Sequence, residues 1–238
     1  MGVTTAYVVY ECPACEERFV DERRCPDCNV FCRRLGPGGC CPSCGEIVLA
    51  DDLAEVAQLT LENTVIRDRF TGTAVLTLEQ AHDLGCLGYV ARASGLATDA
   101  RIEHPTCGLP VTPLTQTSGD VLARFTLRAA EFAASTRLAT HLIGTADQLS
   151  FRGAPAQEAG AHQPPGAVRS GVGIVEAWRG TIVHRVEVDT DERLTRVKIV
   201  DPSWFNWPAL PLALSGTIVP DFPVTNKSFN LSYAGNDL

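Results

Sequence analysis

The stretch GDVLARFTLRAAEFAASTRLATHLIG (residues 119–144) organises the chain, because it reads as one long helix. An acidic residue suits a helix N-terminus, and glycine commonly follows the last turn. We therefore expect the helix to begin near Asp120 and to end before Gly144.

One face of this expected helix carries charges. Helical spacing places Arg124, Arg128 and Glu131 on the same side, and Ser135 continues the row. Such a stripe is either a face in contact with water or, in a packed helix, part of a buried ion network. Buried charges are tolerated only when they are paired and hydrogen-bonded, so the second interpretation requires partner charges elsewhere in the chain.

Downstream of the helix, composition predicts a loop and then strands. The Gly, Pro and Ala content of FRGAPAQEAGAHQPPGAVRSGVG (151–173) is typical of an irregular surface loop. GIVEAWRGTIVHRVEVD (173–189) and RLTRVKIVD (193–201) are two β-rich runs separated by an acidic turn, which predicts an antiparallel hairpin. The tail is punctuated by proline, with short helical pieces expected between Pro208 and Leu214.

Upstream, TLEQAHDLG (77–85) predicts a short helix, with Thr77 and Gln80 as a capping box and Gly85 as the stop. A further helix is expected in ADDLAEVAQLTLENTVI (50–66), where acidic residues precede apolar residues at close to helical spacing.

These observations predict a division into two domains. The segment 1–50 is short and rich in Cys, Pro and Gly, and it has too little apolar periodicity to bury a core alone. The segment 51–238 has the composition of a folded domain. The fold class is therefore α+β, with a small Cys-rich module followed by a mainly helical domain that carries a β-hairpin.

Charge and hydropathy exclude some classes of function. The formal net charge of −8, without a basic stripe, argues against nucleic acid and anionic lipid as partners. The sequence has no apolar run near 18 residues and no basic, apolar leader, so we expect no transmembrane segment. The expected location is cytoplasmic, with the protein docked on a larger assembly.

Eight of the ten cysteines cluster near the N-terminus, and only Cys86 and Cys107 lie beyond. In a chain without a secretory signal this clustering predicts metal binding rather than disulfides. The eight predicted metal ligands are Cys12, Cys15, Cys25, Cys28, Cys32, Cys40, Cys41 and Cys44.

The spacing permits two ligand pairings. A CPxC turn points two thiolates at one ion, and two such turns complete a tetrahedral site. In the first pairing, Cys12 and Cys15 join Cys25 and Cys28, and the other four cysteines form a second site. In the interleaved pairing, Cys12 and Cys15 join Cys41 and Cys44. Spacing does not choose between the two.

Zinc is the ion that this pattern favours, as one or two ions per chain, because paired CxxC turns are typical of structural zinc ribbons. An iron–sulfur cluster is the alternative, although the C-x2-C-x2-C run of many ferredoxins is missing. A structural role that folds the small segment is favoured over a catalytic role.

The segment from about Leu59 to the C-terminus resembles the C-terminal half of the large subunit of NiFe hydrogenases and of its relative in respiratory complex I. The resemblance rests on GCLGYVARASGLATDAR (85–101), on the spacing of charges between residues 119 and 135, and on GIVEAWRG (173–180). NWPAL (206–210) and the closing block DFPVTNKSFNLSYAGND (221–237) follow in the same order.

In this family the long helix belongs to a packed bundle, so the resemblance implies that the charged stripe pairs with Asp99, Asp120 or Glu176 as a buried ion network near a former redox site. The candidate polar network consists of Arg92, Asp99, Arg101, Asp120, Arg124, Arg128, Glu131, Glu176 and Arg179.

The nickel ligands of the hydrogenases are not matched. Those enzymes hold nickel and iron with two pairs of cysteines, and aligning the closing block on Asp221, Ser228 and Asp237 puts the second pair at Ser232 and Gly235. Glycine has no ligand atom and serine is a poor nickel ligand. The half of the family that carries the first pair is replaced by the Cys-rich module, so no NiFe centre is expected.

The resemblance implies a complex I-like subunit without NiFe chemistry in a membrane-associated, hydrogenase-related or quinone oxidoreductase complex. The expected partners are an iron–sulfur small subunit and membrane subunits, with quinone as a candidate ligand, and the chain is at most one subunit of that oxidoreductase. Two alternatives stay open: a non-enzymatic zinc-ribbon binding or assembly protein, and a fusion of a ribbon with a decayed large-subunit fragment.

Overall fold

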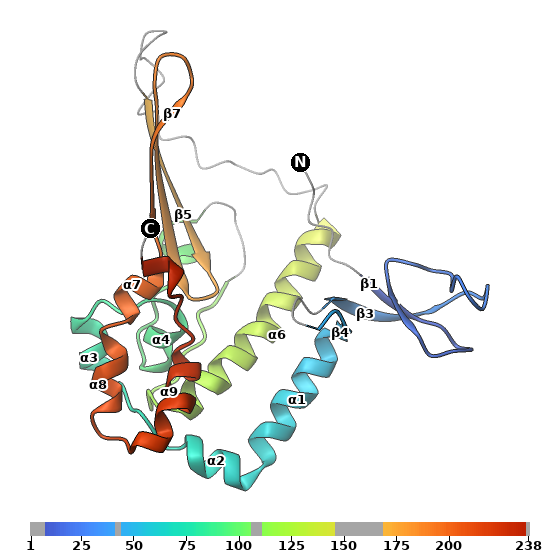
Figure 1. Cartoon of the computed structure of the whole chain (residues 1–238), viewed down its shortest axis with the longest axis horizontal. Coiled ribbons are helices and arrows are strands. Elements are labelled where there is room, and N and C mark those ends of the chain that lie inside the picture. Colours follow the sequence, from blue (N-terminus) through green and yellow to red (C-terminus); the bar gives the residue numbers. More distant parts are fainter. Residues whose placement is uncertain (1–7, 41–43, 106–110, 146–168, 237–238) are drawn as a thin grey trace. The chain divides into compact units, whose positions relative to one another are not determined.

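The computed structural model describes residues 8–40, 44–105, 111–145 and 169–236. Within these ranges the chain forms two compact units (Figure 1). Unit 1 draws on residues 1–67 and 129–149, and unit 2 on residues 68–128 and 150–238. The domain boundary that the sequence predicts at residue 50 stays a prediction.

Unit 1 contains a four-stranded antiparallel sheet in the order β2-β1-β3-β4. Its strands are β1 (Val8–Glu11), β2 (Arg18–Val20), β3 (Arg33–Cys40) and β4 (Ile47–Leu49). Val9 is fully buried in the central strand β1, and a side chain at Gly38 of β3 would collide with it. Glycine therefore lets β3 and β4 pack closely over the small apolar centre of this unit.

The helix predicted in residues 50–66 is confirmed as α1 (Ala50–Glu62), and α2 (Thr64–Phe70) follows it. Asp52 stabilises the start of α1: its carboxylate accepts hydrogen bonds from the Leu49 amide at 3.0 Å and from Arg18 at 2.8 Å. The apolar residues Leu53, Val56 and Leu59 nevertheless remain 45–60% exposed. The helix was predicted from this apolar face of α1, and the described residues leave the face largely exposed.

Unit 2 is mainly helical. Its helices are α3 (Leu78–Asp83), α4 (Gly88–Ala93), α5 (Ala100–Glu103), the first turns of α6 (Val121–Thr145), α7 (Pro202–Asn206), α8 (Ala209–Leu214), η1 (Val219–Asp221), α9 (Phe222–Phe229) and η2 (Ala234–Asn236). The core of unit 2 gathers Leu76, Tyr89, Leu127 and Phe229, with small residues of α4 and α8 between them.

Two sequence predictions about helices are confirmed, and a third is confirmed at its start only. The helix α6 continues through Gly144 to Thr145, past its predicted end, because one glycine inside a helix costs only about 1 kcal/mol. The Thr77 hydroxyl accepts a hydrogen bond from the Gln80 amide at 3.1 Å, and the Gln80 side chain accepts one from the Thr77 amide at 2.9 Å, which completes the capping box of α3. Asp120 accepts a hydrogen bond from the Ala123 amide at 2.7 Å and so caps α6. A helix also forms at α8, where the proline-punctuated tail predicted one.

The sheet of unit 2 has one strand more than predicted. β5 (Arg169–Ala177), β6 (Gly180–Val188) and β7 (Leu194–Val200) form an antiparallel ribbon in sequence order. The predicted hairpin is β6–β7, but the first β-rich run turns back on itself at Trp178 and Arg179, and β5 reaches into the segment predicted as loop. Pairing with β6 supplies the hydrogen bonds that make the Gly-rich start of β5 a strand. Residues 151–168 of the predicted loop lie outside the described residues.

A close backbone contact joins α4 to the β5–β6 turn. Gly88 has φ +64°, and a Cβ there would lie 2.1 Å from the carbonyl oxygen of Arg179. Gly180 has φ +133° and faces the same contact from the other side. Glycine at both positions lets the sheet sit directly on the N-terminus of α4.

The combination of helices with antiparallel sheets confirms the predicted α+β class. No helix in the described part of the chain is both long and apolar enough to cross a lipid bilayer.

Candidate functional site

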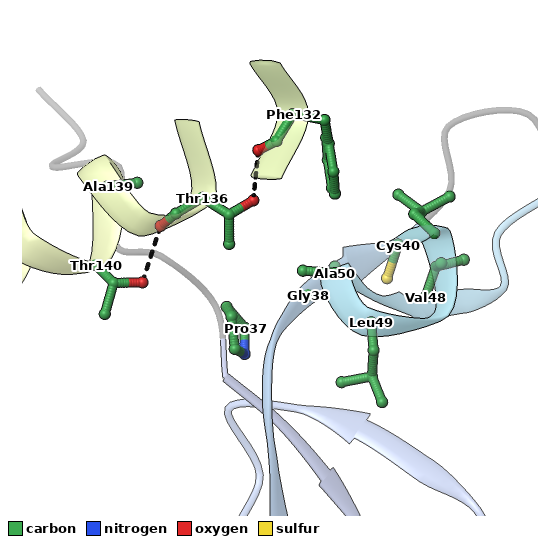
Figure 2. A pocket seen from close by; sticks show the side chains of 12 residues that line it. Pro37, Gly38, Cys40, Val48, Leu49, Ala50, Phe132, Thr136, Ala139 and Thr140 are labelled. Atoms are coloured by element: carbon green, nitrogen blue, oxygen red, sulfur yellow. Dashed lines mark hydrogen bonds between the residues drawn. The ribbon is translucent and has the colours of Figure 1, made fainter. Parts of the chain in front are cut away.

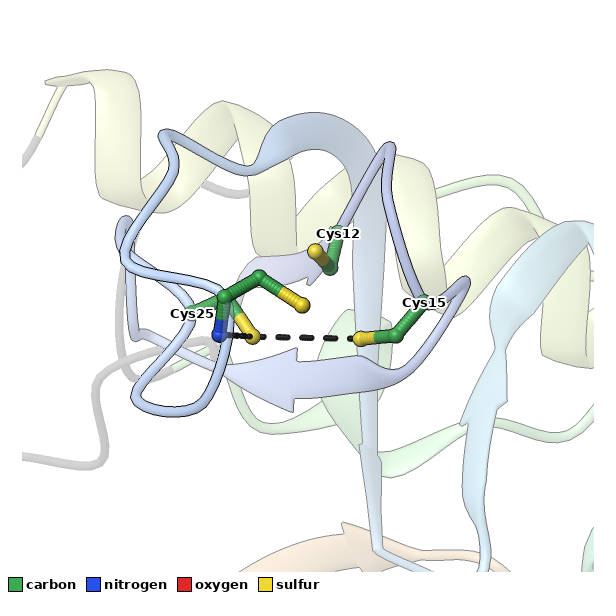
Figure 3. Close-up of side chains that lie close together, drawn as sticks. Cys12, Cys15 and Cys25 are labelled. Atoms are coloured by element: carbon green, nitrogen blue, oxygen red, sulfur yellow. Dashed lines mark hydrogen bonds between the residues drawn. The ribbon is translucent and has the colours of Figure 1, made fainter.

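Two tight turns of unit 1 present four cysteines toward one point. Cys12 and Cys15 belong to the turn after β1, and Cys25 and Cys28 to the turn after β2 (Figure 3). In each turn the residue after the second cysteine is left-handed, with φ +60° at Glu16 and +54° at Asn29. The two turns are therefore built alike.

Backbone hydrogen bonds show the same equivalence. The Glu16 amide donates to the Cys12 carbonyl at 2.9 Å, and the Asn29 amide donates to the Cys25 carbonyl at 3.0 Å. Within the turns, the Ala14 amide donates to Cys12 Sγ and the Cys28 amide donates to Cys25 Sγ, each at 3.4 Å. Such donors stabilise thiolates that hold a metal ion.

The distances between the sulfur atoms fit a tetrahedral metal site. The four Sγ atoms lie within 4.8 Å of one another, and Cys15 Sγ is 3.8 Å from Cys25 Sγ. A tetrahedral zinc ion with Zn–S bonds of about 2.3 Å would place its sulfur ligands about 3.8 Å apart. The cluster formed by Cys12, Cys15, Cys25 and Cys28, here called the four-cysteine group, can therefore hold a metal ion with little rearrangement.

The thiol pKa values agree with this arrangement. Burial would raise the pKa of Cys12, but backbone hydrogen bonds from Cys15 and Ala14 outweigh it and lower the pKa to about 7. The hydrogen bond with Cys15, followed by burial, raises the pKa of Cys28 to about 12. Hydrogen bonds thus favour the thiolate form at Cys12, and a divalent cation would displace the protons of the other thiols.

The remaining predicted ligands are not part of this group. Cys32 is half-buried nearby, and burial, together with the charges of Cys12 and Cys25, raises its pKa. Cys40 and Cys44 are exposed, and no second group of three or more ligands forms among the residues that are described. Cys41 lies outside the described residues, so the second site stays a prediction. The four-cysteine group matches the first site of the first pairing considered above.

In unit 2, four of the predicted polar residues form a buried ion cluster. Arg92 donates to Glu176 at 2.9 Å and lies 3.8 Å from a carboxylate oxygen of Asp99. Arg101 grips Asp99 with two parallel bonds of 2.9 and 2.6 Å. The side chains of Arg92, Asp99 and Glu176 are no more than 4% exposed, and that of Arg101 is 30% exposed. Two cations and two anions balance, as burial requires.

Backbone and hydroxyl groups complete this cluster. Glu176 accepts hydrogen bonds from the Ala100 amide and the Thr181 hydroxyl, each at 3.1 Å, and Arg92 donates to the Thr98 carbonyl at 2.9 Å. Burial would raise the pKa of Asp99, but the hydrogen bonds and charge of Arg101 outweigh it and lower the pKa. The cluster ties α4, α5 and the sheet together.

The α6 residues have other partners. Arg124 is fully buried and donates to Ser228 at 2.9 Å, to the Gly119 carbonyl at 2.7 Å and to the Ala74 carbonyl at 2.9 Å. Its guanidinium lies 4.3 Å from the centre of the Phe229 ring. Burial lowers its pKa to about 10. Among the described residues Arg124 makes no ion pair with Asp99, Asp120 or Glu176. Its direct partners are two carbonyls, the Ser228 hydroxyl and the Phe229 ring, and the charge of Asp120 offsets only part of the effect of burial on its pKa.

The carboxylate of Asp120 accepts hydrogen bonds from backbone amides and from one hydroxyl. Besides capping α6, its carboxylate accepts hydrogen bonds from the Gly72 amide at 2.8 Å and from the Ser118 hydroxyl at 2.9 Å.

Arg128 and Arg179 flank an exposed tryptophan. Their guanidinium carbons lie 4.9 and 5.0 Å from the Trp178 ring centre. Arg179 Nε donates to the Asn230 carbonyl at 2.5 Å, and Arg128 donates weakly to the Lys227 carbonyl at 3.4 Å. The Tyr89 ring lies 5.6 Å from that of Trp178. Arg128 therefore contacts aromatic rings. The spacing of charges along the helix gave no indication of these contacts.

Glu131 is half-buried on a later turn of α6 that belongs to unit 1, whereas the residues of the buried ion cluster belong to unit 2. Sequence reasoning missed Thr181 and Trp178 as partners, and only the strand pairing of β5 with β6 would have suggested Thr181. Ser228 could have been found from the sequence, because the alignment of the closing block already rests on it.

In the closing block, Ser232 and Gly235 stand at the positions where the alignment puts the second cysteine pair of the hydrogenases. The Ser232 hydroxyl accepts a hydrogen bond from the Gly235 amide at 3.0 Å. A Cβ at Gly235 would lie 2.6 Å from the carboxyl carbon of Asp201 and 2.9 Å from one of its oxygens. Asp201 in turn caps α7 by accepting a hydrogen bond from the Ser203 amide at 2.7 Å. The space of a cysteine side chain at position 235 is therefore filled.

Unit 1 also holds an apolar cavity of about 430 Å³ (Figure 2). Phe132, Thr136 and Thr140 of α6 line one side, opposite β3, β4 and the start of α1. Both threonine hydroxyls donate to carbonyls of their own helix, at 3.0 and 2.9 Å. None of the described residues that line the cavity is charged, so they offer apolar contacts rather than acid–base chemistry.

Known proteins share much of this sequence. The chain is 28% identical over 189 residues to formate hydrogenlyase subunit 5 of Escherichia coli, an alignment that covers 78% of this chain and 32% of the relative. It is 28% identical over 201 residues to NADH-quinone oxidoreductase subunit 4 of Thermus thermophilus, covering 73% of this chain and 48% of the relative. The chain thus spans about a third to a half of the length of these relatives.

A solved structure shares the fold. A chain of the membrane-bound sulfane sulfur reductase, described as an archaeal respiratory membrane complex, superposes with a TM-score of 0.65 and 24% identity, over 79% of this chain and 52% of that chain. The family described as the respiratory-chain NADH dehydrogenase 49 kDa subunit matches residues 46–154 and 151–237. These matches cover most of the sequence, and the chain accordingly belongs to the family of the 49 kDa subunit of the respiratory-chain NADH dehydrogenase.

Proposed function

We propose that this chain is a subunit, without NiFe chemistry, of a membrane-associated oxidoreductase complex related to complex I and to the hydrogenases. The observation that carries the proposal is the contact between Gly235 and Asp201. A thiol ligand at position 235 would have to displace a carboxylate that caps α7, and the neighbouring Ser232 hydroxyl is engaged with the backbone. Nickel would find neither the ligand nor the space at this place.

The four-cysteine group is proposed to bind zinc in a structural role. Four cysteines complete a tetrahedral shell and leave no open position for a substrate or water. The metal would hold together a sheet whose buried apolar centre is small. Catalysis at this metal is therefore not part of the proposal.

The buried cluster of Arg92, Asp99, Arg101 and Glu176 is proposed as the polar centre of the subunit. Its charges balance and its hydrogen bonds fix the orientation of every member. Such a cluster keeps a defined electrostatic field inside the fold, which a proton- or electron-linked assembly requires.

The partners are proposed from the relatives. Relatives such as NADH-quinone oxidoreductase subunit 4 are named as subunits of larger assemblies, and this chain covers less than half of that relative. We infer that its partners in such an assembly are an iron–sulfur small subunit and membrane subunits, with quinone as the candidate substrate of the assembly. Peripheral attachment to the inner face of the membrane follows from that arrangement.

A second candidate is a non-enzymatic binding or assembly protein. It is favoured by the four-cysteine group, which lies in a unit separate from the buried cluster. The surface of that unit also carries arginines, Arg23 and Arg34, that pair with no acid among the described residues.

Purification of the tagged chain from detergent-solubilised membranes of cells that naturally produce it separates the two candidates. The leading proposal expects one stable assembly with an iron–sulfur absorption band contributed by a second polypeptide and with quinone reductase activity. Recovery of the chain without any redox-active partner would favour the binding protein.

A further inference from the structure

The surface of unit 1 next to the four-cysteine group has an open hollow of about 410 Å³, lined by Val8, Tyr10, Arg23 and Arg34. Tyr10 is only 9% exposed and forms an apolar floor together with Val8. Tyr10 and Arg34 are directly opposite one another in the β1–β3 pairing, which places both side chains on the same face of the sheet.

The two arginines of this hollow have no carboxylate partner, unlike their neighbours. Arg18 is paired with Asp52 at 2.8 Å, and Arg33 with Glu11 at 2.8 Å. Within the described ranges neither Arg23 nor Arg34 lies within ion-pair distance of an acid.

An aromatic and basic pair continues this surface along the chain. Arg24, the neighbour of Arg23, lies 5.5 Å from the centre of the Phe31 ring. Phe31 is 76% exposed, and the preceding Val30 is 37% exposed. The Cys25–Cys28 turn holds this segment, since the Cys25 amide donates to the Val30 carbonyl at 3.0 Å. Guanidinium groups and apolar side chains are therefore presented by a rigid turn.

We propose that the hollow and the Arg24–Phe31 pair bind an acidic peptide segment of a partner protein, with carboxylates on Arg23 and Arg34 and an apolar side chain over Tyr10. Arginine forks bind carboxylates with paired hydrogen bonds, and preorganised donors lose little entropy on binding. The site rests on unit 1 alone and does not depend on the proposed redox assembly.

Nucleic acid fits this surface less well. Sequence-independent binding to a nucleic acid typically uses about six to ten phosphate contacts, and this surface offers three arginines. The exposed acids Asp21, Glu22 and Asp27 also lie close to Arg23 and Arg24 in the sequence, and their repulsion of a polyanion increases with its length and charge.

Fluorescence anisotropy of the full zinc-loaded chain tests the proposal. The probe is a labelled peptide of about twelve residues that repeats Glu-Glu-Leu-Glu. Its counterparts are the same peptide with Lys in place of Glu and an oligothymidylate of similar length. We expect the acidic peptide to bind, with a Kd about tenfold weaker (about 1.4 kcal/mol) in the double variant Arg23→Ala, Arg34→Ala.

Arg33→Ala is the matched control. Arg33 precedes Arg34 on β3, points to the opposite face and is paired with Glu11, so its removal should change the Kd less than about twofold. Unchanged zinc content verifies that each variant keeps its fold. Absence of peptide binding by the parent chain, an equal loss in Arg33→Ala, or tighter binding of oligothymidylate through the same arginines would each overturn the proposal.

Discussion

At the scale of single residues, the buried charges of unit 2 depend on one another. Glu176→Gln removes the charge that faces Arg92, while Arg92 stays about 98% buried. Breaking one partner of a buried pair costs about 3–5 kcal/mol, because the other charge is left uncompensated. Glu187→Gln, which breaks the more exposed pair with Arg185, should cost at most about 1 kcal/mol. Urea denaturation of both variants measures the difference, and equal losses would contradict a buried network.

Asp99 makes a second residue-scale prediction, which concerns pH. Its pKa in the folded chain lies below its ordinary value of 3.8, so its contribution to stability is fully present above that value. The contribution is lost as the pH falls through the lowered pKa, because protonation releases Arg101. In Asp99→Asn the free energy of unfolding should be lower at neutral pH and should fall less steeply below about pH 4. Parallel pH profiles for variant and parent would speak against this pairing.

At the scale of elements, the contact between α4 and the β5–β6 turn can be tested with two glycines of similar backbone. Gly85 and Gly88 have φ +65° and +64°, but only a Cβ at Gly88 would meet another atom, at 2.1 Å from the Arg179 carbonyl. Gly85→Ala should cost about 1–2 kcal/mol from its left-handed backbone alone. Gly88→Ala should cost about 1–3 kcal/mol more, since the sheet must move away from α4. Thermal melts of the two variants should differ accordingly, and identical melts would show that the contact tolerates a side chain.

How far the elements could be predicted depends on whether their signals are local. The capping box of α3 and the aspartate that caps α6 act within three residues, so the sequence predicted both helices. The β5–β6 turn was missed because Trp178 and Arg179 are not typical turn residues and the turn depends on Gly180. In the candidate site, the contact of Arg124 with Ser228 joins residues 104 positions apart, and spacing carries no information on such a pair. The four-cysteine group was among the predicted alternatives, but only folding selects it.

At the scale of the whole molecule, apolar surface remains uncovered among the described residues. Leu53, Val56 and Leu59 of α1 are each about half exposed. Exposed apolar patches of this kind usually mark contacts with other chains. The isolated chain should therefore self-associate, and the triple variant Leu53→Gln, Val56→Gln, Leu59→Gln should shift it toward monomer in light scattering after gel filtration. A parent chain that is already a monodisperse monomer would contradict the need for a covering partner.

The metal content of this family member tests most directly whether its metal is a structural zinc and whether its fold has no place for nickel. The measurement is elemental analysis of the purified full chain, alone and within its native assembly. We expect at least one zinc ion per chain, a loss of one zinc in Cys25→Ser and none in Cys86→Ala, whose thiol is buried in unit 2, with no stoichiometric nickel in any sample. Stoichiometric nickel in the chain, or zinc content unaffected by Cys25→Ser, would contradict this expectation.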